Sequence, residues 1–146
     1  MKIKLIVNPR KCTGCAQCVL FCSAVKTDQF WPQKAHLVIQ TNSREGYSTP
    51  IVCLQCEDAW CQNACSFEAI NRNTKTGAIE IDPEVCTGCK LCVSACPYDV
   101  IVFDKSKEIA VKCDLCGGQP ICVEVCYPKA LQAIEFKEIV QTDTLS

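Results

Sequence analysis

The sequence predicts an α+β fold in which short helices and β-hairpins form two similar units. Three observations favour this fold. The 16 cysteines of the 146-residue chain fall into four groups of four, with none left over. Short apolar segments and hairpin patterns recur after the later groups, which indicates an internal repeat. The segments between the groups are too short to build a large apolar core, so we expect the cysteines and what they bind to form it.

The four groups share a compact spacing. Groups one and three read C-x2-C-x2-C-x3-C, with Pro97 after group three, whereas groups two and four have a wider gap in the middle. Group one is Cys12, Cys15, Cys18 and Cys22; group two is Cys53, Cys56, Cys61 and Cys65; group three is Cys86, Cys89, Cys92 and Cys96; group four is Cys113, Cys116, Cys122 and Cys126. Bacterial-type ferredoxins hold [4Fe–4S] clusters with this run, and in two-cluster ferredoxins the fourth cysteine binds the other cluster. Each run therefore needs a partner run, and we expect four [4Fe–4S] clusters with all 16 cysteines as ligands.

Disulfides and zinc sites are the other uses of cysteine to weigh. Disulfides belong to oxidising compartments, but the apolar run near the N-terminus is too short for a signal peptide and no segment is long enough to span a bilayer. We therefore expect a cytoplasmic protein that does not insert into a membrane. Structural zinc sites use paired C-x2-C motifs. Groups two and four resemble such pairs, but the third closely spaced cysteine of groups one and three has no place in them.

The elements between the groups follow from apolar runs and turn residues. Asn8-Pro9 ends an apolar run at 4–7, and Asn-Thr-Lys-Thr-Gly at 73–77 separates two short strand patterns. In the first part of the chain we expect a strand at 4–7, a linker at 26–31, a strand at 35–40 and a turn or loop at 42–50. We then expect three short helices, at 67–70, 97–101 and 128–131. A hairpin of 70–72 with 78–81 follows the first of these helices, a hairpin of 102–103 with 109–111 follows the second, and a last strand at 131–136 follows the third. The last strand is able to pair with the first.

The repeat also predicts the domain organisation. A cysteine group, a short helix, a hairpin and a second group make one unit, so groups two and three form a unit at about 50–107. Groups one and four form the other unit, at about 1–30 with 108–136, folded around the first. The whole chain, 1–146, is then one polyferredoxin domain with a polar tail at 137–146. Metal binding is expected to supply much of its folding free energy.

By its cysteine groups and their order, the span from about 4 to 136 resembles the four-cluster electron-transfer subunits of the dimethyl-sulfoxide-reductase and formate-dehydrogenase type, which include hydrogenase-linked polyferredoxins. The widened group two and the segment Lys-Cys-Asp-Leu-Cys-Gly-Gly at 112–118 carry the resemblance. The compact form is similar to the small polyferredoxin partnered with tungsten aldehyde oxidoreductases. Ser23 departs from the pattern, because a proline usually follows the fourth cysteine.

The resemblance implies how the ligands are shared. Each cluster takes the first three cysteines of one group and the fourth cysteine of a partner group. The implied sets are Cys12, Cys15 and Cys18 with Cys126; Cys113, Cys116 and Cys122 with Cys22; Cys53, Cys56 and Cys61 with Cys96; and Cys86, Cys89 and Cys92 with Cys65.

The expected function is electron transfer without catalysis, because a catalytic cluster usually keeps an iron site open and here all 16 positions are filled. The resemblance implies that a catalytic subunit with pterin-held molybdenum or tungsten covers one end of the row of clusters. An aldehyde oxidoreductase is the expected partner of this kind. At the other end, the resemblance implies a flavin subunit, a membrane subunit or another polyferredoxin. Self-association of the protein, which would extend the row of clusters, is a further expectation. A free, soluble ferredoxin-like carrier is the alternative.

Three further features bear on partners and on residue roles. The formal net charge of −1 gives no support for nucleic-acid binding. The sequence has no glycine-rich nucleotide loop of the Rossmann or P-loop kind. The single histidine, His36, is expected to be a structural or surface residue.

Overall fold

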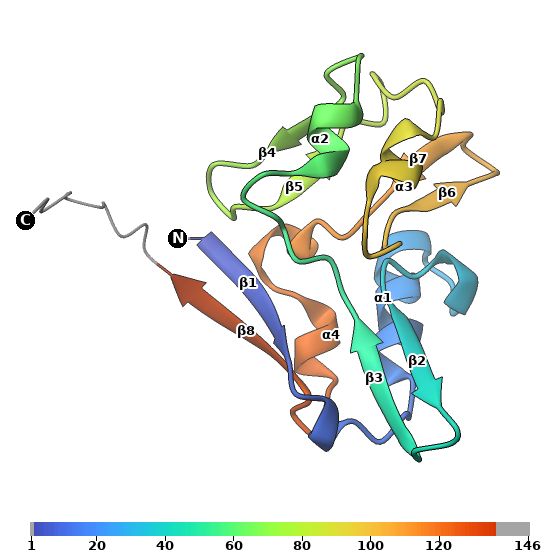
Figure 1. Ribbon diagram of the computed structural model, residues 1–146, viewed down its shortest axis with the longest axis vertical. Coiled ribbons are helices and arrows are strands. Elements are labelled where there is room, and N and C mark those ends of the chain that lie inside the picture. Colours follow the sequence, from blue (N-terminus) through green and yellow to red (C-terminus); the bar gives the residue numbers. More distant parts are fainter. Residues whose placement is uncertain (1, 137–146) are drawn as a thin grey trace, which may run out of the picture.

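The computed structural model describes residues 2–136, and the tail expected at 137–146 lies outside them. Helices and strands alternate along this part of the chain (Figure 1). The helices are α1 (Gln17–Thr27), α2 (Trp60–Ala64), α3 (Leu91–Ala95) and α4 (Ile121–Glu124), with short 3-10 helices η1 (Pro9–Lys11), η2 (Pro32–Lys34) and η3 (Leu115–Gly118). The strands are β1 (Lys2–Val7), β2 (Val38–Asn42), β3 (Tyr47–Ile51), β4 (Ile70–Arg72), β5 (Ile79–Ile81), β6 (Val102–Asp104), β7 (Ile109–Val111) and β8 (Leu131–Phe136). Nowhere in residues 2–136 is a helix long and apolar enough to cross a membrane.

The strands form separate two-stranded antiparallel sheets. β1 pairs with β8, with Leu5 opposite Ala133, so the expected pairing of the first and last strands is confirmed. The two expected hairpins are also confirmed, as β4–β5 and β6–β7. The backbone N–H of Ile3 donates to the carbonyl of Thr76 at 2.9 Å. This bond ties β1 to the turn between β4 and β5.

The elements separate into two halves (Figure 1). The lower half holds α1 and α4 with the pairs β1–β8 and β2–β3, and the upper half holds α2 and α3 with the pairs β4–β5 and β6–β7. Within the halves, α1 packs on α4 and α2 packs on α3. Buried side chains gather in two clusters, one around Leu5, Leu115 and Leu131 and the other around Ile70 and Ile101. Both clusters include cysteines, as expected for a core built around them.

The prediction of three short helices after the fourth cysteines is wrong. The following segments are turns that lead into extended backbone: 67–70, 97–101 and 128–131. Each holds one residue in the left-handed conformation, namely Glu68 (φ 54°), Asp99 (φ 56°) and Lys129 (φ 59°). Pro97 and Pro128 explain two of these turns, because the residue before a proline avoids helical backbone. The short helices lie instead before the fourth cysteine of groups two, three and four.

The turn or loop expected at 42–50 is only partly right: a turn is present at 43–46, but the residues on either side of it belong to the strands of the β2–β3 hairpin. The turn is closed by Asn42, whose Oδ1 accepts from the backbone N–H of Arg44 at 3.1 Å and of Glu45 at 3.3 Å. Pro50 lies in β3, where it is tolerated because β3 has a neighbour on one side only.

Helix α1 is the longest helix of residues 2–136, with 11 residues, and includes the first two residues of the linker expected at 26–31. Ser23, where the family has a proline, lies inside this helix and is fully buried. Its hydroxyl donates to the carbonyl of Leu20 at 2.7 Å and accepts from the backbone N–H of Trp31 at 3.0 Å. A proline here would break the helix, so the absence of the usual proline is compatible with α1 continuing past Cys22.

Candidate metal centres

Four small cavities are each lined by four cysteines, three from one group and the fourth from another. Cavity 1 is lined by Cys12, Cys15, Cys18 and Cys126; cavity 2 by Cys22, Cys113, Cys116 and Cys122; cavity 3 by Cys53, Cys56, Cys61 and Cys96; cavity 4 by Cys65, Cys86, Cys89 and Cys92. Their volumes, open mouths included, are ≈ 310, 340, 350 and 330 Å³. The structure thus brings together the same sets of cysteines that the resemblance implies.

The packed helix pairs explain how the groups exchange a cysteine. Helix α1 carries Cys18 and Cys22 on one face, because they are four residues apart. Cys18 lines cavity 1 and Cys22 lines cavity 2. Helix α4 carries Cys122 into cavity 2, and Cys126 after the helix lines cavity 1. The packed helices α1 and α4 therefore serve both cavities together, and α2 and α3 do the same for cavities 3 and 4.

The residue before the second cysteine has a left-handed backbone in all four groups. These residues are Gly14 (φ 72°), Gln55 (φ 48°), Gly88 (φ 75°) and Leu115 (φ 57°). The left-handed residue curls the loop so that the first three cysteines line the same cavity. Glycine adopts this backbone without strain, and the sequence signals it in groups one and three. Gln55 and Leu115 carry no such signal.

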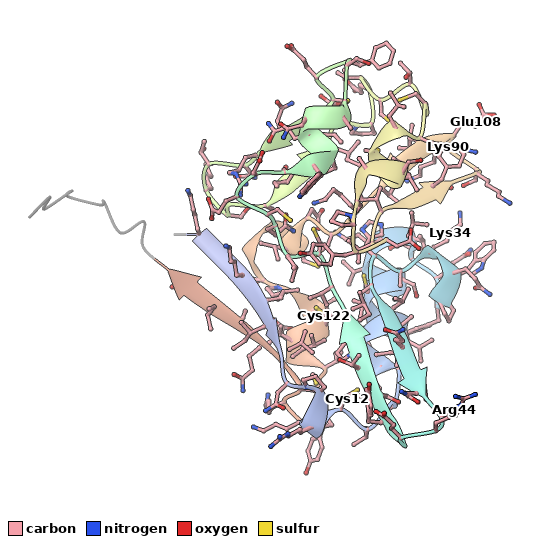
Figure 2. All side chains as sticks on the ribbon, viewed as in Figure 1. Cys12, Lys34, Arg44, Lys90, Glu108 and Cys122 are labelled. Carbon is pink, nitrogen blue, oxygen red and sulfur yellow. The ribbon has the colours of Figure 1, made fainter. Side chains whose placement is uncertain are left out.

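Gly88 is also required by close packing. A Cβ atom on Gly88 would lie 2.2 Å from the carbonyl oxygen of Glu108, so the β6–β7 hairpin rests directly on this loop. Lys90, two residues after Gly88, makes a cation–π contact with the same hairpin: its Nζ lies 4.3 Å from the centre of the Phe103 ring. Figure 2 shows Lys90 and Glu108 beside each other at this place. The hairpin thereby covers the cysteine loop of cavity 4.

Burial makes a bare thiolate costly in these cavities. It raises the pKa of Cys18 and of Cys92 to about 11 and that of Cys113 to about 12, and nearby cysteines add to the effect. Several thiolates at one cavity therefore need positive charge close by, which bound iron supplies.

The donor set fits iron–sulfur clusters better than zinc. Among residues 2–136, no three Cys, His, Asp or Glu side chains converge on a single metal ion. A structural zinc ion requires four ligands at one tetrahedral centre. Four cysteines instead line each cavity, and His36 and Asp114 also line cavity 2. Four cysteine sulfurs spread around one space match the requirements of a cluster that contains several irons.

Backbone N–H groups approach the sulfurs of two exchanged cysteines. The N–H of His36 donates to Sγ of Cys22 at 3.3 Å, and that of Leu131 donates to Sγ of Cys126 at 3.4 Å. Such bonds orient ligands and tune metal centres. Burial, with the charge of Lys26 adding to it, lowers the pKa of His36 to about 4, so its imidazole is neutral at pH 7. His36 is therefore a buried structural residue, and its N–H···S bond had no signal in the sequence.

Shared elements define the order of the cavities. The packed helices α1 and α4 join cavities 1 and 2, and the packed helices α2 and α3 join cavities 3 and 4. Lys112 lines cavity 3 and directly precedes Cys113 of cavity 2, so it joins the two pairs. The cavities thus form a row from 1 to 4 that runs through both halves of the molecule.

The ends of this row are close to solvent. Of the 16 cysteines, two are exposed, Cys15 in cavity 1 and Cys89 in cavity 4. In Figure 2, Cys12 of cavity 1 and Lys90 beside cavity 4 lie toward opposite ends of the long axis, and Cys122 of cavity 2 lies between them. The arrangement suits one-electron transfer along the row, with an accessible site at each end.

Known proteins share this pattern. The family described as 4Fe-4S dicluster domain matches residues 44–136, and a 4Fe-4S binding domain matches residues 9–26. The polyferredoxin-like subunit of aliphatic sulfonate oxidoreductase from Pyrococcus furiosus is 37% identical over 92% of this sequence and 78% of its own length. A polypeptide of anaerobic dimethyl sulfoxide reductase from Haemophilus influenzae is 32% identical over 94% of this sequence and 74% of its own length.

A solved structure shares the fold. One polypeptide in the active-site complex BamBC of benzoyl coenzyme A reductase, solved with benzoyl-CoA, superposes with a TM-score of 0.54 over 90% of this chain and 78% of its own, at 19% identity. The α+β ferredoxin-like fold is thereby confirmed, and the family match and the sequence relatives confirm the expected class of iron–sulfur electron-transfer subunits. With 37% identity across nearly its whole length, this protein belongs to the 4Fe-4S dicluster family and is a polyferredoxin-like electron-transfer protein of the kind found as subunits of oxidoreductases.

Proposed function

We propose that the protein holds four [4Fe–4S] clusters, one in each cavity, and transfers electrons between a molybdenum or tungsten oxidoreductase and a second redox partner. The observation that carries the proposal is the row of four cysteine-lined cavities with an exposed cysteine at each end. A bound cluster supplies one-electron chemistry. The residues of the chain set the order of the clusters, their separation from solvent and the two points of electron entry and exit.

All 16 cysteines are the proposed iron ligands, in the sets that line cavities 1 to 4. The two proposed units follow from them: groups one and four with cavities 1 and 2, at about 1–30 with 108–136, and groups two and three with cavities 3 and 4, at about 50–107. The separate clusters of buried residues in the two halves support this division. Sixteen thiols committed to metal also favour a reducing, cytoplasmic location.

The proposed catalytic partner carries a pterin-held molybdenum or tungsten and docks near cavity 1, with aldehyde oxidation as the best single reaction. The named functions of the relatives, a sulfonate oxidoreductase and a dimethyl sulfoxide reductase, support an oxidoreductase as the partner. A flavin subunit or another polyferredoxin, a second copy of this chain included, would dock near cavity 4. Exposed apolar side chains suit docking at both ends: Tyr127 next to Cys126 is 92% exposed, and Leu91 beside Cys92 is 50% exposed.

Purification from the native host under anaerobic, non-denaturing conditions tests this proposal. The tagged protein is expected to elute with a larger subunit that contains molybdenum or tungsten. Tyr127→Glu should reduce recovery of that subunit about tenfold, because it places a charge in an apolar contact, while leaving the iron content unchanged. Leu91→Glu, at the other end, is the matched control and should retain the subunit. Recovery of the wild-type protein alone, as a monomer that reduces acceptors freely, would favour a soluble carrier.

A further inference from the structure

Lys112 and Gln55 meet at the boundary between cavities 2 and 3. Lys112 precedes Cys113, which lines cavity 2, and Lys112 itself lines cavity 3. Gln55 lies between Cys53 and Cys56 in the loop that surrounds cavity 3. Both side chains are buried, with 5% of Lys112 and 1% of Gln55 exposed. An electron that moves from one half of the molecule to the other has to cross this boundary.

A closed hydrogen-bond network holds the two side chains in place. The Lys112 ammonium donates to Oε1 of Gln55 at 3.3 Å, to the carbonyl of Cys113 at 3.1 Å and to the carbonyl of Ile79. The Gln55 amide accepts from the backbone N–H of Ile79 at 2.8 Å and donates to the carbonyl of Cys113 at 3.0 Å. All three protons of the ammonium therefore have partners, and every one of these partners is a neutral group.

In the described part of the chain, no carboxylate forms an ion pair with this ammonium. None of the ion pairs within residues 2–136 involves Lys112. A buried charge without a counter-charge is strongly unfavourable, so its compensation must come from other anionic groups nearby. The cysteine thiolates of cavities 2 and 3 are such groups, because Lys112 lines cavity 3 and directly precedes Cys113 of cavity 2.

Gln55 occupies its position at a conformational cost. Its φ of 48° is left-handed, and groups one and three have glycine at the same place. A glycine would remove this strain, but it could neither accept from the ammonium nor bond the backbone of Ile79 and Cys113. The strained backbone is therefore retained together with a side chain that positions Lys112.

We infer that the Lys112 ammonium acts as a fixed positive charge that raises the reduction potentials of the clusters in cavities 2 and 3, with Gln55 as its positioning residue. Reduction adds one negative charge to a cluster, and a nearby cation stabilises that charge. Electrons crossing between the two units would then find their most favourable sites at the centre of the row. The inference rests on the proposed function, since it requires clusters in these two cavities.

Anaerobic redox titration followed by electron paramagnetic resonance tests the inference. At a fixed solution potential, Lys112→Met should lower the ratio of reduced to oxidised cluster about tenfold for the central pair, a shift of about 59 mV for one electron. Lys112→Arg retains the charge and should stay near the wild type. Gln55→Glu has almost the same shape as glutamine, and its carboxylate should shift the ratio in the same direction as Lys112→Met by cancelling the ammonium. The exposed Lys105→Met is the matched surface control, for which we expect little change.

The iron content separates the possible outcomes. Unchanged ratios in Lys112→Met or Gln55→Glu protein with full iron would overturn the inference. Loss of iron from both variants would also overturn it, because the network would then be purely structural. Failure of the proposed function would appear differently, as wild-type protein without clusters in cavities 2 and 3.

Discussion

Removing the iron is expected to unfold most of the chain. Each sheet has only two strands, and α2, α3 and α4 have five, five and four residues, so these elements are marginal by themselves. The cysteines belong to both clusters of buried side chains, and without metal their sulfurs surround cavities instead of bonded atoms. After anaerobic chelation, hydrogen exchange should show loss of protection for most amides of residues 50–107.

The two halves should differ in how much hydrogen-exchange protection remains after chelation of the iron. The first half contains the long helix α1, the six-residue pair β1–β8, and the fully buried Leu115 and Leu131. We expect residual protection there, at the pairing of β1 with β8. Full retention of protection and circular dichroism throughout the iron-free protein would contradict a fold that depends on its clusters.

Cys22→Ser is expected to damage the cluster held by Cys113, Cys116 and Cys122, more than 90 residues away in sequence. Cys22 lines cavity 2, not cavity 1, although Cys18 lies one helical turn before it. Serine oxygen is a poor substitute for thiolate as a ligand of iron. We expect the loss of one cluster signal in four, or its conversion to a three-iron form, with about one to four irons lost per chain.

Cys126→Ser is the reciprocal control. Cys126 lines cavity 1, so this variant should damage the cluster of Cys12, Cys15 and Cys18 and spare that of cavity 2. The two variants should therefore remove different spectroscopic signals. If Cys22→Ser removed the cluster of Cys12, Cys15 and Cys18, the exchange of the fourth cysteines would be wrong.

Cysteine spacing was sufficient to predict the four groups and the class of protein, because the first three cysteines of each group lie close together in sequence, as cluster ligands do in ferredoxins. The β4–β5 and β6–β7 hairpins and the β1–β8 pairing also followed from apolar runs and turn residues, whereas the β2–β3 hairpin was missed. The short helices were displaced by a few residues, since the pattern after the fourth cysteine reads as helical although Asp99 and Lys129 adopt left-handed turns beside prolines.

Other features depend on contacts between distant segments and had no signal in the sequence. Gln55 and Leu115 adopt the glycine-like backbone with buried side chains, and Gln55 bonds Ile79 and Cys113, which are distant in the sequence. The network of Lys112 joins residues from three separate segments, so only the folded protein reveals it.

Iron and acid-labile sulfide counted in anaerobically purified wild-type protein test the central claim most directly. Four [4Fe–4S] clusters in cavities lined by all 16 cysteines require about sixteen iron and sixteen sulfide per chain. The same sample should show the signals of interacting clusters when it is reduced. Stoichiometric zinc with little labile sulfide would contradict the account.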